Sequence, residues 1–171
     1  LFEEDAKHFH SVCKSACDKH DKNFYEDYKK RCDEYFYNSH RNEGRGIGGL
    51  FFDYCKANDT MDMQQWYAFV TAVGDSFLEA YTPIVEKRKN LTYTEAQRDW
   101  QEIRRGRYVE FNLVHDKGTL FGLKTNGRIE SILMSLPAHV QWVYDHHPEK
   151  GSEEEKLIEV LKNPIEWAAS A

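Results

Sequence analysis

The chain has 171 residues, of which 40% are hydrophobic and 14% aromatic, a composition of folded domains rather than of disordered chains. Its net charge of −6 argues against a protein that captures nucleic acid by broad electrostatic attraction. The longest apolar run is 66–70, far below the roughly 18 residues of a membrane-spanning helix. We therefore expect one folded domain over 1–171 and no membrane span.

The four cysteines form no C-x-x-C pair, and the chain begins without the charged and apolar regions of a signal peptide. We therefore expect reduced thiols and a cytoplasmic location. The chain opens directly with an acidic turn that favours helix initiation, Glu3-Glu4-Asp5, and it has no starting Met. We expect it to be a fragment of a longer protein.

Three segments of the first half carry apolar residues at the spacing of amphipathic helices. These expected helices span 3–20, 24–39 and 61–89, with a kink or break at Pro83. The glycine-rich stretch 44–49 is followed by an expected buried strand over 50–54. The stretch lacks the Gly-Lys-Ser/Thr ending of a phosphate loop, so its glycines indicate either close backbone packing or close approach of a ligand.

The second half begins with a short expected helix over 94–104. Apolar and polar residues then alternate from Arg107 to His115, which predicts a strand, and Asp116-Lys117-Gly118 predicts a hairpin turn. A closing helix is expected at 152–161, with Ser152 as its N-cap. The further expected strands are 118–125, 128–136 and 140–146. This order of elements predicts an α+β fold, in which helices cover an antiparallel sheet.

Eight basic residues gather around the glycine-rich stretch and the expected hairpin, although the chain as a whole is acidic. Arginine binds carboxylates through two parallel hydrogen bonds, so this set predicts a site for an anionic ligand. The alternative is a set of ion pairs with Glu43, Glu102, Glu110 and Glu130. The basic residues are Arg41, Arg45, Arg104, Arg105, Arg107, Lys117, Lys124 and Arg128.

His10, Cys13 and Cys17 share one face of the first expected helix, at a spacing from which side chains can hold a metal. Half-buried cysteine and histidine on an amphipathic helix are more often packing residues. The residues alone therefore favour packing over a metal site.

Five motifs span most of the chain: His40-Arg41-Asn42-Glu43, Arg45-Gly46-Ile47-Gly48-Gly49-Leu50-Phe51-Phe52-Asp53, Arg104-Arg105-Gly106-Arg107-Tyr108-Val109-Glu110-Phe111-Asn112-Leu113, Gly118-Thr119-Leu120-Phe121-Gly122 and Arg128-Ile129-Glu130-Ser131-Ile132-Leu133-Met134-Ser135-Leu136-Pro137. Together they resemble the oxygen-dependent coproporphyrinogen III oxidase family, and the resemblance runs from Phe2 to Trp167. Family members have a long preceding portion with a Gly-Gly-Gly and an Asp-Leu-Thr-Pro segment. We therefore expect this chain to be the C-terminal portion and to be inactive by itself.

The resemblance implies oxidative decarboxylation of coproporphyrinogen III to protoporphyrinogen IX in haem and porphyrin biosynthesis. It implies molecular oxygen as co-substrate, no required cofactor, and a homodimer. It also implies a large flat antiparallel sheet covered by helices on both faces, in agreement with the pattern above. Some relatives lie in the mitochondrial intermembrane space, which is the alternative to a cytoplasmic location.

Asp116 stands at the position of the family's acidic residue. The resemblance therefore implies that Asp116 hydrogen-bonds pyrrole N–H groups. From the pattern alone, Asp116 at a hairpin tip is more often a turn residue. The family usually has Tyr or Trp, then Asp-Arg-Gly, where this chain has His115-Asp116-Lys117-Gly118. Lys117 keeps the charge but loses the two-pronged contact of arginine.

The other implied site residues bind substrate or metal. Asn126-Gly127-Arg128 corresponds to a substrate-binding turn that is usually Gly-Gly-Arg in the family. Arg45, Arg107 and Lys117 are the further expected substrate-binding residues. His10 and His40 match divalent-metal ligands of bacterial members, whereas eukaryotic members are regarded as metal-free, so we expect no required metal.

Two other functions are compatible with the charge pattern. A non-catalytic carrier or sensor of anionic tetrapyrroles shares the arginine cluster, but it consumes no oxygen and does not need Asp116. A single-stranded RNA module would combine arginines with Tyr108 and Phe111. The net charge and the expected placement of these two rings on opposite strand faces argue against RNA.

Overall fold

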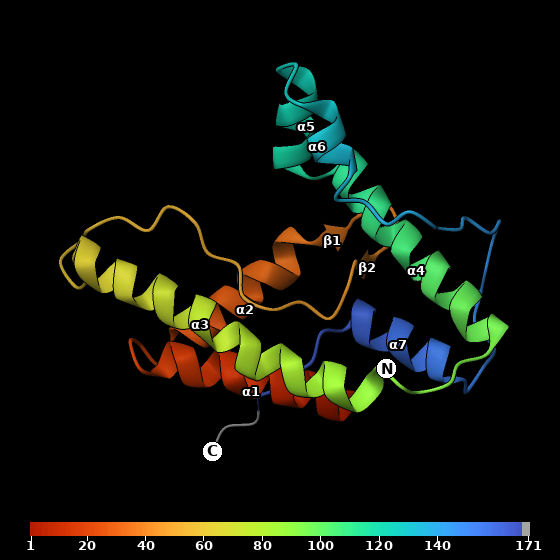
Figure 1. The fold of residues 1–171 in the computed structure, drawn as a ribbon, viewed down its shortest axis with the longest axis horizontal. Helices are drawn as coiled ribbons and strands as arrows, with labels where there is room; N and C mark the ends of the chain where they lie inside the picture. Colours follow the sequence, from red (N-terminus) through yellow and green to blue (C-terminus); the bar gives the residue numbers. More distant parts are fainter. Residues whose placement is uncertain (169–171) are drawn as a thin grey trace. The chain divides into compact units, whose positions relative to one another are not determined.

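The computed structural model describes residues 1–168, and these form two compact units (Figure 1). Unit 1 comprises Leu1, Phe36–Gly46 and Thr92–Asn163. Unit 2 comprises Phe2–Tyr35, Ile47–Leu91 and the described residues 164–168. The expected single domain over 1–171 stays a prediction.

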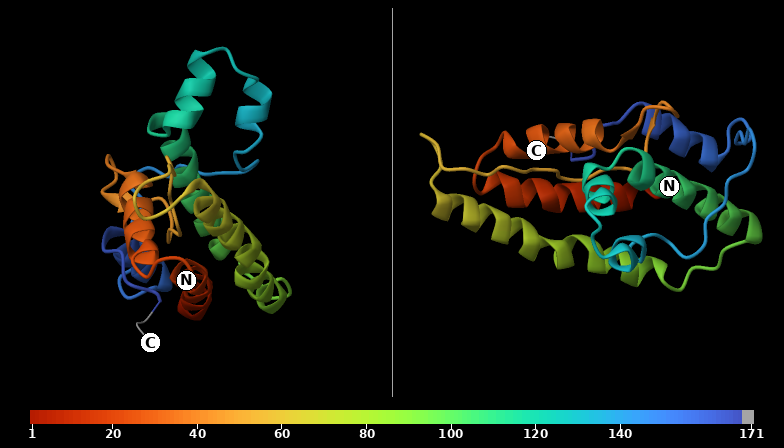
Figure 2. Two further views of the ribbon diagram at one scale, coloured as in Figure 1. Left: turned by 90° about the vertical axis from the view of Figure 1, so that its left-hand side faces the viewer. Right: turned by 90° about the horizontal axis from the view of Figure 1, so that it is seen from above.

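Unit 2 is built from three helices, α1 (Glu3–Asp18), α2 (Phe24–Tyr35) and α3 (Met63–Arg88). Figure 2 shows α1 between α2 and α3. Asp62 begins α3 with a capping box, because its side chain accepts from the Gln65 backbone N–H while the Gln65 side chain accepts from the Asp62 N–H. Pro83 lies inside α3 without ending it.

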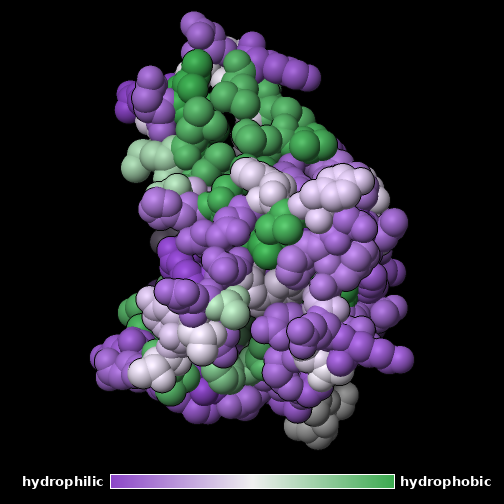
Figure 3. All heavy atoms as spheres, turned by 90° about the vertical axis from the view of Figure 1, so that its right-hand side faces the viewer, coloured by the Kyte–Doolittle hydropathy of each residue, from purple (hydrophilic) through white to green (hydrophobic). Residues whose placement is uncertain are grey.

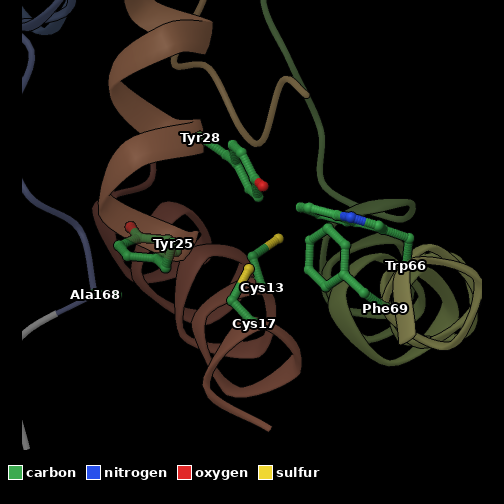
Figure 4. Close-up of a cluster of buried hydrophobic side chains, with 7 residues drawn as sticks. All are labelled: Cys13, Cys17, Tyr25, Tyr28, Trp66, Phe69 and Ala168. Carbon is green, nitrogen blue, oxygen red and sulfur yellow. The ribbon is translucent and has the colours of Figure 1, made fainter. Parts of the chain in front are cut away.

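The core of unit 2 is an aromatic cluster in which Trp66 and Phe69 of α3 face the two cysteines of α1 and Tyr28 of α2 (Figure 4). Phe24 stacks on Trp66 with ring centroids 5.5 Å apart and on Phe69 edge to face at 4.9 Å. The buried members are Cys13, Cys17, Tyr25, Tyr28, Trp66, Phe69 and Ala168. Burial raises the pKa of Cys13 to about 11 and that of Cys17 to about 12, so both thiols are packing groups.

Unit 1 contains a two-strand antiparallel hairpin and four helices among its described residues. The strands β1 (Tyr37–Asn38) and β2 (Glu43–Gly44) pair Tyr37 with Gly44 and Asn38 with Glu43. The helices are α4 (Glu95–Val114), α5 (Lys117–Lys124), α6 (Ile129–Leu133) and α7 (Glu153–Lys162). The buried Asn38 side chain donates to the Arg107 carbonyl at 3.1 Å, which fixes the hairpin against α4.

The expected α+β fold with a large antiparallel sheet is wrong. Within 1–168 the sheet consists of β1 and β2 alone, and the expected strands 107–115, 118–125 and 128–136 lie largely in α4, α5 and α6. The expected strands 50–54 and 140–146 have no regular secondary structure.

The physical reason lies at the helix starts. The capping box of Thr94 and Gln97 begins α4, and Asp116, expected at a hairpin tip, instead caps α5. Arg107 and Phe111 are both buried, and their spacing of four residues fits a helix face as well as it fits alternation.

The five expected helices are confirmed, although the one over 24–39 ends at Tyr35 and the one over 94–104 extends to Val114. Those over 3–20 and 61–89 are α1 and α3, and that over 152–161 is α7 with Ser152 as N-cap. In α7 the Glu155 side chain accepts a hydrogen bond from the Gly151 N–H, one residue before the N-cap. None of the helices in the described part of the chain is long and apolar enough to cross a membrane.

Candidate functional site

The Glu110 carboxylate on α4 is the centre of the densest polar cluster in unit 1. Arg41 donates to both of its oxygens, at 3.0 and 2.7 Å, and Arg107 donates to Oε1 at 3.1 Å. His40 Nε2 lies 2.9 Å from Oε2, and the Trp142 indole N–H donates to Oε1 at 3.0 Å. Four side chains from three segments thus converge on one carboxylate, which is 11% exposed.

The charge state of this carboxylate follows from opposing effects. Burial raises the pKa of Glu110, but hydrogen bonds from Arg41 and His40, together with the charge of Arg107, lower it to about 2. Burial lowers the pKa of Arg107, against the attraction of Glu110. Glu110 is therefore ionised at neutral pH and acts as the counter-charge of the cluster.

His40 also contacts a second imidazole. Its Nδ1 lies 2.9 Å from Nε2 of His115, which follows the last residue of α4. One nitrogen of each such pair must carry the proton, so Glu110, His40 and His115 form one hydrogen-bonded chain. Because His40 uses different nitrogens for its two partners, the three groups do not converge on a common point.

A second buried carboxylate, Glu43 on β2, pairs with Arg104 and also lies near Arg107. Arg104 donates to it at 2.7 Å, and Arg107 Nε lies 3.6 Å away. Arg41, Arg104 and Arg107 therefore form ion pairs with glutamates, which was the alternative to an anionic-ligand site. Among the described residues, no ion pair is formed by Arg105, Lys117, Lys124 or Arg128.

Arg45 binds differently, through aromatic faces. Its guanidinium carbon lies 4.1 Å from the ring centroid of Phe36, 4.8 Å from Tyr108 and 4.9 Å from Phe111. Tyr108 and Phe111 thus lie on one side of α4 against the same cation, and their expected placement on opposite strand faces is wrong. Phe111 is 1% exposed, so its ring is no stacking surface for a base.

Asp116 is the N-cap of α5, and its Oδ2 accepts from the Thr119 backbone N–H at 2.7 Å. The cap places its half-buried carboxylate where the chain leaves α4 and enters α5. Lys117 is the first residue of α5 and is exposed. Turn chemistry therefore explains part of the choice of aspartate here, and any functional role adds to it.

The Asn126-Gly127-Arg128 segment joins α5 to α6. Asn126 has a positive φ of 57°, and the Gly127 N–H donates to the Gly122 carbonyl at 2.8 Å. A Cβ on Gly127 would lie 2.8 Å from that carbonyl oxygen, so only glycine fits this turn without a shift. Arg128, the exposed N-cap of α6, makes no side-chain capping bond.

His10 belongs to unit 2, apart from the residues above, which all belong to unit 1. It is 1% exposed, and its Nδ1 lies 3.0 Å from the Tyr25 hydroxyl, which donates to Glu166 at 2.8 Å. Burial lowers the pKa of His10 to about 4, so the ring is neutral. No group of three potential metal ligands occurs in the residues that the structure describes.

Unit 2 also has an open hollow of about 650 Å³, bounded by the aromatic cluster and the loop before α3. Phe24, Tyr28 and Trp66 form part of its wall, and Arg31 and Lys56 are among its charged residues. None of the site residues expected from the sequence lines it.

The α5–α6 end of unit 1 presents apolar side chains to solvent. Phe121 is 69% exposed and Met134 79%, and Figure 3 shows apolar atoms gathered over this end of the molecule. Leu113, Val114, Ile129 and Leu133 are also exposed. The exposed cations Lys117, Lys124 and Arg128 belong to the same helices or their caps, so charge and apolar surface occur together.

Sequence reasoning missed Glu110 as the centre of the cluster, with His115 and Trp142 as its members. The signal was present for Arg107 and Glu110, which are three residues apart and face each other on a helix. It was absent for Trp142, which lies 32 residues from Glu110 along the chain and outside any regular element.

Residues 1–167 match the coproporphyrinogen III oxidase family. The chain is 58% identical over 167 residues to the chloroplastic coproporphyrinogen-III oxidase 1 of Arabidopsis thaliana, a match that covers 98% of this chain and 42% of that protein. It is 55% identical over 166 residues to the oxygen-dependent coproporphyrinogen-III oxidase of Francisella philomiragia, covering 97% and 53%. The chain thus spans about half the length of the curated relatives that it matches.

Proposed function

Because the chain belongs to the coproporphyrinogen III oxidase family, we propose that it is part of an enzyme that converts coproporphyrinogen III to protoporphyrinogen IX with molecular oxygen. Two propionate side chains of the substrate become vinyl groups. In each step a propionate, one oxygen molecule and one proton give a vinyl group, carbon dioxide and hydrogen peroxide. The substrate carbon is oxidised and oxygen is reduced by two electrons.

Besides family membership, the chemical character of the surface of α5 and α6 supports this proposal. Coproporphyrinogen is an apolar macrocycle that carries four carboxylates. Exposed Phe121 and Met134 offer apolar contact, and Lys117 and Arg128 offer cations that form no ion pair in the described part of the chain. An anionic amphiphile matches this combination better than a purely polar ligand does.

We propose that Asp116 hydrogen-bonds the pyrrole N–H groups. A pyrrole N–H is a far weaker acid than a carboxyl, whose usual pKa is near 3.9, so proton removal by Asp116 is not feasible. A hydrogen bond to a carboxylate instead enriches the ring in electrons and favours its reaction with oxygen. The resulting peroxide takes hydrogen from the propionate, and carbon dioxide leaves.

Arg128 and Lys117 are proposed to bind propionates, with Asn126 and Gly127 shaping the turn that presents Arg128. We propose that Arg45 and Arg107 support the propionate-binding surface from the interior of unit 1, without direct contact with the substrate. The Arg45 guanidinium is packed against three rings, and Arg107 is 8% exposed and paired with Glu110. Direct contact of Arg107 with a propionate would require that pair to open.

We propose that no organic cofactor and no metal is required. The contacts of the two histidines support this, since His10 is buried beside Tyr25, and His40 contacts Glu110 and His115. Oxygen is the co-substrate.

The proposed assembly is a homodimer, and the proposed location is the cytoplasm or the mitochondrial intermembrane space. The plant relatives are named chloroplastic, which adds a plastid to these compartments. Fractionation of the source cells decides between them.

The binding part of the proposal is tested under argon with coproporphyrinogen III and the 171-residue chain. We expect Trp fluorescence to change on binding of the tetra-acid, and no change with the macrocycle whose four carboxylates are esterified. An equal fluorescence change with the tetra-acid and with its ester would exclude the proposed binding role of Lys117 and Arg128. The non-catalytic carrier or sensor shares this binding but predicts no oxygen uptake in any assembly.

A further inference from the structure

His115 is the sequence neighbour of Asp116, and it stands where the family usually has Tyr or Trp, so the resemblance implies no role for it. The His115 N–H donates to the Phe111 carbonyl at 2.8 Å, and the Asp116 N–H donates to the same oxygen at 2.9 Å. Phe111 is buried, so this shared acceptor holds the two backbones in a fixed relation. Consecutive Cα atoms lie about 3.8 Å apart. A ligand held by Asp116 therefore comes within reach of His115.

The two ring nitrogens of His115 have different surroundings. Nε2 lies 2.9 Å from Nδ1 of His40 and is engaged in that contact. Nδ1 has no hydrogen-bond partner within the described part of the chain. It is also not one of the buried side-chain atoms that lack a partner among these residues, so it is accessible to solvent. The half-buried ring of His115 thus presents one nitrogen to a ligand while the other is held by the protein.

Glu110 determines which nitrogen of His115 carries the proton when the two imidazoles are neutral. An ionised carboxylate only accepts hydrogen bonds, so His40 Nε2, at 2.9 Å from Glu110 Oε2, must be the donor. A neutral imidazole has one donor and one acceptor nitrogen. His40 Nδ1 is therefore the acceptor and takes its hydrogen bond from His115 Nε2, which leaves His115 Nδ1 without a proton. Glu110 and His40 are thus positioning residues that give His115 an accessible acceptor.

An accessible acceptor next to a carboxylate suits a ligand with several N–H donors. Coproporphyrinogen III presents four pyrrole N–H groups, whereas Asp116 has two carboxylate oxygens and uses Oδ2 to cap α5 through the Thr119 N–H. Asp116 by itself therefore does not provide one acceptor for each donor of the macrocycle. The ionised propionates of the same ligand have no hydrogen to donate, so the bare nitrogen of His115 cannot hydrogen-bond them. The chemistry of this nitrogen selects the pyrrole N–H groups.

We propose that His115 is a further substrate-binding residue, whose Nδ1 accepts a hydrogen bond from a pyrrole N–H next to the one bound by Asp116. The inference rests on the proposed function and adds a basis for specificity to it. Coproporphyrin III, the oxidised form of the macrocycle, has the same four propionates but only two N–H groups and two bare nitrogens. His115 therefore favours the reduced macrocycle over its oxidised form, while Lys117 and Arg128 do not distinguish them.

Titration calorimetry of the 171-residue chain under argon, with coproporphyrinogen III and with coproporphyrin III, tests this preference. His115→Trp introduces a side chain that can donate to His40 but cannot accept a hydrogen bond. It should weaken binding of the reduced macrocycle about 5-fold, as expected for one lost hydrogen bond, and leave binding of the oxidised one unchanged. Arg128→Ala should weaken both alike, because both carry the propionates. His139→Trp, at an exposed position of the same unit, should change neither.

Nitrogen-15 NMR of the imidazole rings at pH 8 identifies the protonated nitrogen without substrate. We expect a bare Nδ1 on His115, and for His40→Leu a mixture of both tautomers with a weaker preference for the reduced macrocycle. A protonated Nδ1 on His115 in the unaltered chain would overturn the inference and leave the proposed function intact. Equal effects of His115→Trp on the two macrocycles would do the same. A chain that binds neither macrocycle would overturn the proposed substrate binding, and the role of His115 with it.

Discussion

Asp116 combines a structural and a proposed chemical role, and the two can be separated by substitution. As the N-cap of α5 its carboxylate holds the Thr119 N–H, a task that Asn and Ser perform about equally well. As the proposed partner of the pyrrole N–H groups it must carry a negative charge.

Asp116→Asn and Asp116→Ser should therefore keep the cap and lose the chemistry. We expect their free energies of unfolding to stay within about 0.5 kcal/mol of the parent, whereas Asp116→Ala loses about 1 kcal/mol. Turnover is measured in a chimera in which this chain replaces the matching part of the Francisella philomiragia relative, and it should fall at least ~100-fold for both capped variants. Near-normal turnover of Asp116→Asn would exclude a role for the charge.

Arg128 is expected to act in binding, because a guanidinium on a propionate is engaged both before and during the reaction. Arg128→Ala in the chimera should raise KM more than it lowers kcat, by an amount that corresponds to about 1.5–3 kcal/mol. Arg105→Ala is a matched control in the same unit, since Arg105 also forms no ion pair among the described residues. A collapse of kcat with an unchanged KM would place Arg128 in the transition state instead.

The Glu110 cluster makes stability depend on pH in a defined direction. The pKa of Glu110 in the folded chain is about 2, below the usual 4.5. The contribution of the ionised Glu110 to the free energy of unfolding is therefore fully present above pH 4.5 and is lost as the pH falls toward 2. Glu110→Gln should lower the free energy of unfolding at pH 7 by an amount of the order of 3 kcal/mol. The difference from the parent should shrink below pH 4.5.

Urea unfolding of both proteins from pH 7 to pH 3 measures this difference. Effects of His10, whose protonation also destabilises the fold in acid, cancel because both proteins contain it. Glu130→Gln is the control, because Glu130 is exposed and forms no ion pair in the described structure. A pH-independent difference for Glu110→Gln would show that packing, rather than ionisation, explains its effect.

At the scale of elements, α4 positions the polar cluster through a close approach at Gly106. A Cβ at this buried residue would lie 2.7 Å from the Gln141 carbonyl oxygen, and the Trp142 indole lies just beyond. The segment 140–142 therefore docks on α4 only because residue 106 has no side chain. This contact is what brings the Trp142 N–H to Glu110.

Gly106→Ala should displace that segment, although alanine favours the helix itself by about 1 kcal/mol. We expect a net loss of about 1–3 kcal/mol in the free energy of unfolding, and a red shift of Trp fluorescence as Trp142 becomes more exposed. Gly46→Ala, where an added Cβ meets nothing within 4 Å, should leave both properties unchanged. Equal behaviour of the two variants would exclude the docking role of Gly106.

The sequence predicts the helices that carry long amphipathic patterns, such as α1 and α3, and the helix α7, which begins with a strong cap. It fails between Arg107 and Leu136, where aromatic and β-branched residues favour strands locally, whereas the chain there continues α4 as far as Val114 and then forms α5 and α6. Tertiary contacts outweigh the local preference here, because Arg107 and Phe111 are buried on the same helix face. Two-residue periodicity over short segments cannot exclude such a helix.

The candidate site, like the fold, is predictable from the sequence only in part. The concentration of arginines and the motifs are visible in the sequence, and the family that they indicate is confirmed over residues 1–167. Some of these arginines pair with Glu43 and Glu110, and others stay exposed. The difference depends on contacts between residues up to 70 positions apart. Spacing along the chain does not contain that information.

At the scale of the whole molecule, an acidic chain keeps a local surface of unneutralised cations beside apolar side chains. Net charge −6 repels polyanions at long range, while Lys117 and Arg128 remain free to bind a small tetra-acid at contact distance. Under the proposed function, we expect this arrangement to favour a compact anionic macrocycle over nucleic acid.

The most direct measurement is the formation of protoporphyrinogen IX from coproporphyrinogen III by the chimera, in air and under argon. We predict product in air, none under argon, and two molecules of oxygen consumed per molecule of product. A chimera that is folded and binds coproporphyrinogen III, but forms no product in air while the unaltered Francisella philomiragia relative does, would contradict the proposed function.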